Sequence, residues 1–462
     1  MDIKLVNKLK AILRYSDVFT DEATLHTYSY DSTCLEPVIP EVVVFPNSQE
    51  ELGKVVRVLS QEGYAITVRG SGTNLSGGTI PAKQKGAVIV TTRLNKILEI
   101  NLDDLYARVE PGVITFNLAK EVEKYGLFYP PDPGSQKVST MGGNVAENAG
   151  GLRGLKYGVT GHYVMGLTFF DSFGELVKTG SKTVKCVSGY NLSSFMVGSE
   201  GTLGVISEIT LKLIPKPSFA KSMLVIFDDI EKASFSVSDI IRHKIVPCTL
   251  EFLDNFTIRC VEQFRKTGLP IDAEAMLLIE LDGHKSQVEE EFIQIEKILK
   301  KNGARLIKIA KNSLEKEAIW QARRDALPAL ARIRPSTILE DVTVPRSKIP
   351  EMIKAIQYIQ QKYSLQLGIF GHVGDGNLHP TILTDIRDKE EFIKVEQAID
   401  ELFENCLTLE GTISGEHGIG IAKLKYMPKE FPKGTLVFSS RLKKAVDPKN
   451  ILNPGKLVFR QF

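Results

Sequence analysis

Two histidines flank a sharp turn signal near the C-terminus. The segment reads GHVGDGNLH and contains His372 and His379. Its Asp-Gly pair is the preferred centre of a two-residue type I′ hairpin turn, which would place His372 directly opposite His379. Their Cβ atoms would then lie roughly 5 Å apart on one face. Two imidazoles in this register favour a metal site over a pair of structural histidines.

Two further segments contain side chains that could act beside such a site. Glu416 and His417 are adjacent in ISGEHGIG. If that segment is extended, the two side chains diverge, so Glu416 would face a metal while His417 faces a substrate; the alternative is a plain surface turn. Arg323 and Arg324 follow Trp320 on a predicted helix. One guanidinium there would bind a carboxylate in a bidentate manner, and the alternative is a solvated charged face.

Three glycine-rich segments predict a ligand close to the backbone. RGSGTNLSGG (69–78) would direct successive N–H groups at a phosphate. A Rossmann loop needs a helix directly after its glycines, and TIP stands there instead, so NAD binding is disfavoured. PPDPGSQKVSTMGGNVAENAGG (130–151) predicts a long functional loop beside a flat ligand. VGSEGTLGVISEITL (197–211) has glycines at 198, 201 and 204 before a long strand, and a simple turn explains them equally well.

The elements that position these residues change in character near residue 215. A helical lead-in (1–30) precedes strands at 41–45 and 64–68, with a helix between them that begins at Ser48 and ends at Gly63. Next come a hairpin-like pair (87–91 and 105–109), a helix near 115–125, a turn at 171–174 and a strand at 205–215. The prolines in IPKP (214–217) mark the best domain boundary.

Two β-α-β patterns of similar length follow residue 219. The first runs from MLVIF through a helix near 229–243 to TLEFL, and the second from MLLIEL through a helix near 285–302 to RLIKIA. Together they predict a ferredoxin-like α+β layer. The expected domains are 1–217 and 218–410, followed by a C-terminal segment, 411–462.

Composition and charge exclude several classes of protein. Of 462 residues, 43% are hydrophobic and 25% are charged, which is average for a globular chain. The net charge of +2 gives no reason to expect a nucleic-acid or membrane partner recruited by charge. No apolar run approaches the roughly 18 residues of a membrane span, and charges interrupt the N-terminus, so a cytoplasmic location is expected. The five cysteines never form CxxC, which disfavours a zinc ribbon or an iron–sulfur cluster within this chain.

Taken in order, these segments resemble the FAD-linked oxidases of the vanillyl-alcohol-oxidase type. The resemblance runs from about Pro40 to Lys456 and rests on RGSGTNLSGG, GGNVAENAGG, GSEGTLGVI, GHVGDGNLH, SGEHGIG and DPKNILNPGK. It implies an α+β fold with a two-part FAD-binding domain (1–217, rejoined by 411–462) and a ferredoxin-like cap domain (218–410) that holds the substrate. The branch that it resembles includes D-lactate dehydrogenase and the flavin subunit of glycolate oxidase.

The resemblance also implies a role for each candidate residue. The FAD pyrophosphate would be held by the backbone of Gly70, Ser71, Gly72, Thr73 and Asn74. The rest of the cofactor would be lined by Pro131, Gly134, Ser139, Gly142, Gly143, Asn148, Gly151, Tyr157, Val205, Ile206 and, from the tail, Asn453. One divalent metal (zinc, manganese or iron) would be bound by His372, His379 and Glu416, while Arg323 would bind the substrate carboxylate and His417 would act as the base. A non-covalent FAD is expected, because residues 64–80 contain no histidine to carry it.

The implied reaction is oxidation of a small D-2-hydroxy acid, such as D-lactate or glycolate, to its 2-oxo acid. Oxidisers of D-2-hydroxyglutarate resemble this chain but carry lysine where Leu339 stands and threonine where Leu327 stands, so a second substrate carboxylate would have fewer partners here. A non-redox flavin transferase resembling alkylglycerone-phosphate synthase is disfavoured, because that enzyme has a run of histidines in place of Glu416-His417. An electron-transfer subunit without a substrate site is the third alternative.

The electron acceptor is expected to be external, because the cysteines lack cluster spacing. An electron-transferring flavoprotein, iron–sulfur partner subunits or a quinone would take this role. No nucleic-acid partner and no direct membrane span are expected.

Overall fold

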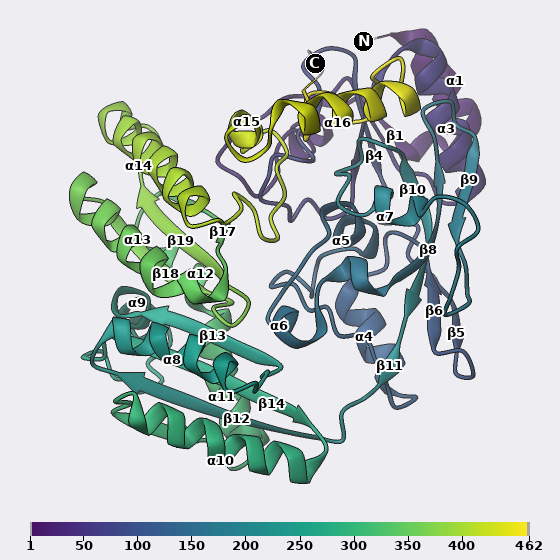
Figure 1. Ribbon diagram of the computed structural model, residues 1–462. Coiled ribbons are helices and arrows are strands. Elements are labelled where there is room, and N and C mark those ends of the chain that lie inside the picture. Colours follow the sequence, from purple (N-terminus) through teal and green to yellow (C-terminus); the bar gives the residue numbers. More distant parts are fainter. Residues whose placement is uncertain (1, 460–462) are drawn as a thin grey trace. The chain divides into compact units, whose positions relative to one another are not determined.

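A computed structural model describes residues 2–459 (Figure 1). The chain forms two compact units. The terminal unit comprises Met1–Gly150, Val159–Lys216 and Glu416–Phe462, and the central unit comprises Gly151–Gly158 and Pro217–Gly415. The chain thus enters the central unit at the proline-rich boundary and leaves it directly before Glu416. Residues 151–158 join the central unit, although the sequence assigns them to the first domain.

A four-stranded sheet in the order β1-β2-β4-β3 forms one layer of the terminal unit. Strands β2 (Val42–Val44), β4 (Gly86–Val90) and β3 (Ala65–Arg69) run parallel, and α3 (Gln49–Glu62) connects β2 to β3. The Ser48 hydroxyl caps α3 by accepting from the Glu51 N–H at 3.1 Å, and Gly63 ends it at φ 69°. Both helix boundaries lie where the sequence predicts them. Buried apolar residues of α3 pack with those of α1 (Ile3–Ile12) in one core.

The predicted hairpin between 87–91 and 105–109 is wrong. β4 lies in the parallel sheet, whereas β6 (Tyr106–Val109) pairs with β5 (Ile97–Asn101) and β10 (Val205–Lys212) in an antiparallel sheet. Every residue of β4 is buried, as in a parallel strand covered on both faces. The antiparallel sheet has the order β5-β6-β10-β8-β9, and its strands β8 (Val164–Phe170) and β9 (Leu176–Gly180) meet at the predicted turn.

The small-residue stretch 130–151 is partly helical, although its composition predicts a continuous loop. Helix α5 (Met141–Glu147) begins after Thr140, whose hydroxyl accepts from the Gly143 N–H at 3.3 Å. It ends at Asn148, which adopts a left-handed φ of 53°. Met141 and Val145 are buried four residues apart. This helical spacing of apolar residues is easily overlooked among so many glycines.

Short elements complete the terminal unit. They are β1 (Val18–Phe19), α2 (Glu22–Thr27), α4 (Thr115–Glu123), β7 (Leu127–Phe128), α7 (Leu192–Met196), β11 (Ile214–Pro215), α15 (Met427–Glu430) and α16 (Lys433–Val446). Strand β1 adds to the edge of the parallel sheet, and β7 pairs with β11.

The central unit contains the predicted ferredoxin-like layer. Its strands are β12 (Phe219–Phe227), β13 (Thr249–Asp254), β14 (Ala275–Gly283) and β15 (Leu306–Ile309), in the antiparallel order β15-β12-β14-β13. Helices α8 (Ile230–Arg242) and α10 (Lys285–Lys301) make the two crossovers. This arrangement confirms the two β-α-β patterns.

Three strands extend this sheet beyond β13. β18 (Gln366–Gly371) pairs with β13, β19 (Asn377–Thr384) with β18, and β16 (Ser336–Leu339) with β19, while the short β17 (Val342–Thr343) also pairs with β19. The other helices of the unit are α6 (Gly154–Tyr157), α9 (Asn255–Arg265), α11 (Ser313–Arg324), α12 (Ala326–Leu330), α13 (Ile349–Tyr363) and α14 (Lys389–Thr408). Helices α13 and α14 lie side by side (Figure 1). The pairing of β13 with β18 brings together residues that are more than a hundred positions apart.

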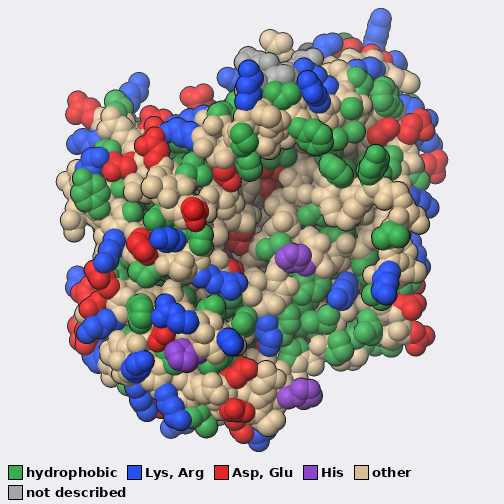
Figure 2. Space-filling model, viewed as in Figure 1, with side chains coloured by type: hydrophobic (Ala, Val, Ile, Leu, Met, Phe, Trp, Pro, Cys, Tyr) green, Lys and Arg blue, Asp and Glu red, His purple; other side chains and the backbone are tan. Residues whose placement is uncertain are grey.

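Basic and acidic side chains are interspersed over the face shown in Figure 2, in keeping with the small net charge. The five cysteines, all within the described residues, form no disulfide; Cys34 and Cys186 are exposed and the other three are buried. Between residues 2 and 459, no helix combines the length and apolar character that a membrane crossing requires.

Candidate active site

The two histidines of GHVGDGNLH lie close together, but not in the predicted register. Residues 372–376 separate β18 from β19, so the turn is longer than two residues. His379 pairs with Phe370, and the Asn377 N–H donates to the His372 carbonyl at 3.2 Å. Of the Asp-Gly pair only the glycine has a positive φ, 93°, whereas a type I′ turn requires it at both central residues. The direct pairing of His372 with His379 is therefore wrong.

The two imidazole rings nonetheless face each other. Their centroids lie 5.2 Å apart at an interplanar angle of 90°, and ring nitrogens of the two residues lie within 4.8 Å of each other. His372 is 7% exposed and His379 is 2% exposed. Two imidazoles so close and so well shielded from water can bind one metal ion from two directions.

A buried carboxylate joins two of the candidate residues. Glu251 lies in β13 and is 0% exposed. Its Oε1 is 2.7 Å from His372 Nδ1, and its Oε2 accepts from Arg323 Nε at 2.5 Å. The strand order places this carboxylate beside the histidine, because β13 pairs with β18.

Arg323 is buried, whereas its neighbour Arg324 lies on a solvated face. The Arg323 guanidinium is 4.8 Å from the centroid of the Phe370 ring, and the residue is 8% exposed. Over residues 2–459, the Arg323 side chain donates one hydrogen bond to the protein, through Nε. That bond leaves the edge with the two terminal NH₂ groups for a carboxylate ligand. Arg324 instead pairs with Glu317 at the surface.

The surroundings of Arg323 are apolar. Phe370 belongs to a hydrophobic cluster that also contains Ile319 and Trp320 of α11. Leu327 and Leu339 are partly buried and pack against the same cluster. The two positions that distinguish this chain from the 2-hydroxyglutarate oxidisers therefore offer no hydrogen-bond donor from their side chains.

A second buried carboxylate, Asp341, holds the segment that leads to Glu416. Asp341 accepts from Asn377 Nδ2 at 2.5 Å, from Ser414 Oγ at 2.8 Å and from the Gly415 N–H at 2.8 Å. It is 0% exposed. One carboxylate thus fixes both the start of β19 and the residues directly before Glu416.

Glu416 and His417 begin the return segment of the terminal unit. A Cβ on Gly150 would lie 2.5 Å from a Glu416 carboxylate oxygen, so the small-residue stretch ends in glycine where Glu416 approaches it. Glu200, from GSEGTLGVI, accepts from both backbone N–H groups of residues 419–420 at 2.7 Å. A carboxylate therefore holds the backbone just after His417.

Burial shifts the pKa values of three charged side chains in the terminal unit, Glu200, Glu147 and Lys456. Desolvation raises the pKa of Glu200 to about 7, although the two backbone N–H groups act in the opposite direction. Desolvation also raises the pKa of Glu147 well above its ordinary value, and the nearby Glu200 charge adds to this effect. Lys456 donates to the Ile80 carbonyl at 2.5 Å, and burial lowers its pKa to about 8. Burial and the neighbouring Glu200 charge therefore both favour the protonated form of Glu147.

The glycine-rich loop 70–74 packs against the start of α5. A Cβ on Gly70 would lie 2.1 Å from Thr140 Oγ1, so only glycine fits there. The Ser71 hydroxyl donates to the carbonyl of residue 138 at 2.6 Å, and Gly72 adopts φ 71°. The next regular element after this loop is strand β4 rather than a helix, which agrees with the argument against a Rossmann site.

The other residues expected to line FAD fall in both units. The terminal unit contains Thr73, Asn74, Pro131, Gly134, Ser139, Gly142, Gly143, Asn148, Val205, Ile206 and Asn453, and the central unit contains Gly151 and Tyr157. Asn453 Nδ2 donates to the carbonyls of Gly78 at 2.8 Å and Glu200 at 2.7 Å, so it ties two glycine-rich segments together. Val205 is buried in the apolar core, and the Tyr157 hydroxyl donates to Asp282 at 2.8 Å.

The glycines of the terminal unit fit a flat ligand such as a flavin dinucleotide. A Cβ on Gly134 would meet no atom within 4 Å, and one on Gly143 would meet only the Thr140 hydroxyl, at 3.2 Å. Neither residue has a positive φ. Packing and backbone conformation therefore do not require glycine at position 134, and the missing side chain leaves room beside the backbone there. In the central unit, the imidazole donors fit zinc, manganese or ferrous iron.

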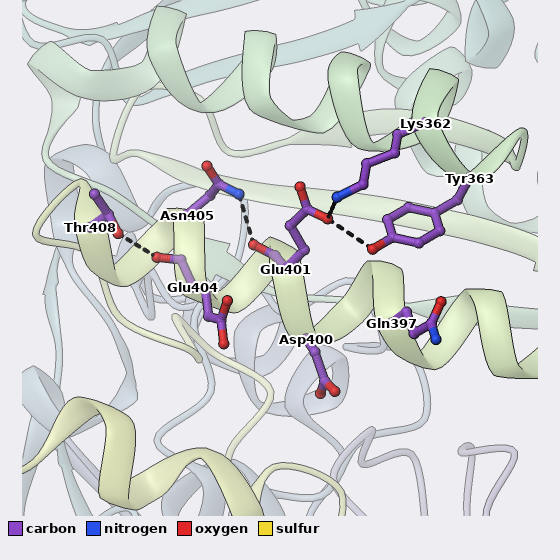
Figure 3. Close-up of a pocket in the computed structure, with 8 residues that line it drawn as sticks. All are labelled: Lys362, Tyr363, Gln397, Asp400, Glu401, Glu404, Asn405 and Thr408. Carbon is purple, nitrogen blue, oxygen red and sulfur yellow. Dashed lines mark hydrogen bonds and ion pairs between the residues drawn. The ribbon is translucent and has the colours of Figure 1, made fainter.

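A polar pocket between α13 and α14 is built from none of these residues (Figure 3). Glu401 accepts there from Lys362 at 2.6 Å and from the Tyr363 hydroxyl at 2.9 Å. Asn405 and Thr408 donate to backbone carbonyls one helical turn earlier. The polar groups in this pocket thus largely satisfy one another on a helix surface.

Sequence reasoning missed Glu251, Asp341 and Glu200 as contributors to the site. Glu251 stands inside the apolar strand TLEFL, and a lone charge in a buried strand is the signal that could have found it. Glu200 lies within the glycine-rich segment GSEGTLGVI, but its hydrogen-bond partners are Ile419 and Gly420, which lie more than two hundred positions later in the chain. No spacing rule covers such a distance.

Family models match most of the chain. The model described as "FAD linked oxidases, C-terminal domain" matches residues 216–457, which is more than half of the chain. The model described as "FAD binding domain" matches residues 40–180. The glycine-rich loop therefore lies within the FAD-binding match, and the histidines within the oxidase match.

Curated relatives cover nearly the whole chain. Glycolate oxidase subunit GlcD of Bacillus subtilis (strain 168) is 50% identical over 430 residues, which are 93% of this chain and 91% of that protein. The subunit of the same name from Escherichia coli (strain K12) is 40% identical over 437 residues, covering 95% and 87%. D-lactate dehydrogenase of Anaerostipes hadrus is 36% identical over 432 residues, covering 91% and 90%.

Solved structures share the fold at low identity. p-Cresol methylhydroxylase aligns with a TM-score of 0.82 at 19% identity, over 98% of this chain and 96% of that one. Alkyldihydroxyacetonephosphate synthase aligns with a TM-score of 0.78 at 20% identity, over 99% and 86%. These likenesses confirm the expected vanillyl-alcohol-oxidase type of fold. The two family matches show that the chain is a flavoprotein that belongs to the FAD-linked oxidases.

Proposed function

We propose that this chain is an FAD-dependent dehydrogenase that oxidises a small D-2-hydroxy acid, such as glycolate or D-lactate, to its 2-oxo acid. The observation that carries the proposal is the buried series Arg323–Glu251–His372, with His379 facing His372. It combines a carboxylate-binding group with metal-type donors in an FAD-linked oxidase. The names of relatives that are 36–50% identical support the same substrate class.

Arg323 and His417 carry the proposed chemistry of the protein itself. The terminal edge of Arg323 binds the substrate carboxylate and orients the α-carbon. Bound FAD supplies the acceptor for the two electrons and the α-hydrogen of the substrate. The hydroxyl proton must leave as well, and His417 accepts it as the general base. Glu200 holds the backbone beyond His417, which restricts the movement of this base.

The proposal includes one divalent metal ion bound by His372, His379 and Glu416. Two observations support it: the imidazoles face each other, and Asp341 fixes the residues that precede Glu416. Such an ion supplies a positive charge that favours the ionised form of the substrate hydroxyl, as it does for water. Mixed nitrogen and oxygen donors suit zinc, manganese or iron.

Removing the metal tests this part of the proposal. Chelator treatment should abolish D-lactate oxidation while FAD stays bound, and added metal should restore it. His379→Ala should lose metal and activity together, measured by elemental analysis and by turnover. A metal-free enzyme that kept full turnover would contradict the metal assignment.

A small substrate is favoured over D-2-hydroxyglutarate. Leu327 and Leu339 pack against the apolar cluster around Phe370, so neither side chain can receive a second carboxylate. Placing an unpaired carboxylate against apolar side chains costs several kcal/mol. We therefore expect lactate- or glycolate-sized acids to be the better substrates.

Electrons leave this chain, in our proposal, to an electron-transferring flavoprotein, to iron–sulfur partner subunits or to a quinone. Three cysteines are buried in the central unit, and the other two are exposed in the terminal unit, an arrangement unlike a cluster ligand set. Two relatives are named as subunits, which supports partner subunits.

We further propose a cytoplasmic location and FAD bound without a covalent link, so acid precipitation should release all the flavin from the polypeptide.

A substrate panel tests the proposed reaction. The FAD-loaded protein is assayed with an artificial electron-acceptor dye and with glycolate, D-lactate, L-lactate and D-2-hydroxyglutarate. We expect the highest kcat/KM for glycolate or D-lactate, and at most a few per cent of it for L-lactate. Higher kcat/KM with D-2-hydroxyglutarate than with both small acids would overturn the assignment of substrate size. No turnover with any 2-hydroxy acid would overturn the proposed function.

A further inference from the structure

We propose that Glu251 is a positioning residue that prepares two groups of the site at once. Its carboxylate sets the tautomer of His372 so that Nε2 is the metal-binding atom, and it orients Arg323 so that the terminal edge of the guanidinium receives the substrate carboxylate. This inference rests on the proposed function for the roles of His372 and Arg323. It adds a residue that no motif of the sequence singles out.

The first step of the argument is that each oxygen of Glu251 has its own partner. Oε1 lies 2.7 Å from His372 Nδ1, and Oε2 lies 2.5 Å from Arg323 Nε. The residue is 0% exposed, so water does not compete for either oxygen. A carboxylate buried in this way is stable only with a cationic partner and well-formed hydrogen bonds, and Arg323 supplies the charge.

The second step concerns the proton on His372. A carboxylate can only accept hydrogen bonds, so the Nδ1 that faces Glu251 must carry the hydrogen. A neutral imidazole then has its lone pair on Nε2. Carboxylate–histidine pairs of this kind fix the ring and strengthen the nitrogen that binds metal, and their loss costs about 10- to 100-fold in metal affinity.

The third step concerns the direction of the guanidinium. The Nε bond to Glu251 and the contact of the cation with Phe370, at 4.8 Å, restrain Arg323 at two points. The remaining edge, with both terminal NH₂ groups, matches a carboxylate in a bidentate manner. Without Glu251 the guanidinium would be free to rotate, and its buried charge would lack a partner.

Glu251→Gln separates the two functions of the carboxylate. Glutamine has nearly the same volume, but it offers one acceptor and one donor. If its oxygen faces Arg323, its NH₂ group faces His372 and forces the hydrogen onto Nε2. If its oxygen faces His372, its NH₂ group opposes Arg323 Nε. Either orientation disturbs one of two features, the tautomer of His372 or the orientation of Arg323. If the inference holds, the variant therefore cannot match the wild type in both metal affinity and KM.

The experiment measures metal affinity and kinetics on the FAD-loaded holoenzyme. Competition with a graded metal chelator should show affinity for manganese or zinc about 10- to 100-fold weaker in Glu251→Gln, or else the KM for D-lactate should rise at least tenfold at saturating metal. Glu280→Gln is the matched control: Glu280 lies opposite Thr249 of β13 and accepts from Trp320 Nε1 at 3.0 Å, and this variant should retain the metal affinity of the wild type. Wild-type values for both quantities in a folded Glu251→Gln protein would overturn the inference.

A measurement on the wild-type protein decides the matter even if the variant fails to fold. The ¹⁵N spectrum of histidine-labelled, metal-free holoenzyme reports which ring nitrogen of His372 is protonated, with the signal assigned through His372→Gln. We expect hydrogen on Nδ1, and hydrogen on Nε2 would overturn the inference. Neither the tautomer nor the chelator competition depends on turnover, so a protein that fails to oxidise D-lactate would contradict the proposed function without contradicting the role of Glu251.

Discussion

At the scale of single residues, the two adjacent arginines of α11 provide a test of the substrate-carboxylate assignment. Arg323 is buried with Glu251 and Phe370, whereas Arg324 pairs with Glu317 on the surface. The two side chains have the same charge and nearly the same place on the helix, but only Arg323 faces the candidate site. Their substitution should therefore have very different consequences.

Arg323→Lys should lower kcat/KM for D-lactate by about 10- to 100-fold, because a hydrogen bond to a charged group contributes about 1.5–3 kcal/mol and lysine cannot bind a carboxylate through two parallel donors. Arg324→Lys should leave kcat/KM unchanged. Steady-state kinetics with a dye acceptor measure both. Equal losses in the two variants, or no loss in Arg323→Lys, would contradict the assignment.

The sequence indicates His372, His379, Glu416 and His417, because these residue types stand in short, recognisable segments, whereas only the family resemblance singles out Arg323 from Arg324. It does not indicate Glu251 or Asp341. Their partners are brought to them by strand pairing, and the pairing of β13 with β18 connects residues more than a hundred positions apart. A local pattern contains no information about such a contact.

At the scale of elements, the glycine-rich loop 70–74 and helix α5 depend on each other. A Cβ on Gly70 would meet Thr140, whose side chain caps α5. A β-branched cap residue cannot move aside without losing its hydrogen bond to the Gly143 N–H. The loop and the helix therefore form one rigid part of the terminal unit, where the glycines expected to approach FAD are found.

Gly70→Ala should weaken FAD binding by about 10- to 100-fold or lower stability by about 1–3 kcal/mol, as overpacking does in a close-packed region. Flavin content after gel filtration and thermal unfolding report the two effects. Gly434→Ala in α16 is the matched control, because a Cβ there meets no atom within 4 Å; this variant should keep its FAD and be equally or slightly more stable. Full FAD affinity and unchanged stability in Gly70→Ala would contradict the proposed packing.

The burial of Glu200 predicts a pH dependence of stability. The pKa of Glu200 is raised from its ordinary 4.5 to about 7, so between these values the native state holds a proton that the unfolded state has released. The contribution of protonated Glu200 to the free energy of unfolding is present below pH 4.5 and is lost as the pH rises through 7. Over this range the free energy of unfolding falls by up to about 1.4 kcal/mol per pH unit because of this one group.

In Glu200→Gln the unfolding free energy should consequently fall less steeply between pH 4.5 and 7 than in the wild type. Urea unfolding at several pH values measures the slope. Glu50→Gln is the control, because Glu50 is exposed and its hydrogen bond with Lys54 lowers its pKa, so it acts below this range. A slope in Glu200→Gln equal to that of the wild type would show that Glu200 does not hold the extra proton.

Elements whose apolar residues repeat at a clear helical or strand spacing can be predicted from the sequence. The position of an element in a sheet cannot be predicted when it depends on pairing with a strand far away in the chain. The caps of α3 and the ferredoxin-like order follow from local signals. The hairpin between 87–91 and 105–109 is wrong because two successive strands enter different sheets. The type I′ turn is wrong because the hydrogen bond from the Asn377 N–H to the His372 carbonyl closes a longer turn than the Asp-Gly signal suggests.

At the scale of the whole molecule, the order of motifs along the chain carries most of the information. Six segments between Pro40 and Lys456 indicate the family, and the family models match residues 40–180 and 216–457. The chain from Glu416 onward is part of the terminal unit, and Gly151–Gly158 are part of the central unit, a division that could not be read from composition. The proposed activity depends on all of these parts together.

Anaerobic reduction of the bound flavin tests the central claim most directly. The FAD-loaded protein is mixed with D-lactate in a stopped-flow instrument, and the long-wavelength flavin band is followed without any electron acceptor. The account predicts that the band bleaches, that one pyruvate forms per flavin, and that deuterium at the α-carbon slows the bleaching, since that bond breaks in the step that reduces FAD. Flavin that stays oxidised with D-lactate and with glycolate, or that is reduced by L-lactate and not by D-lactate, would contradict the account.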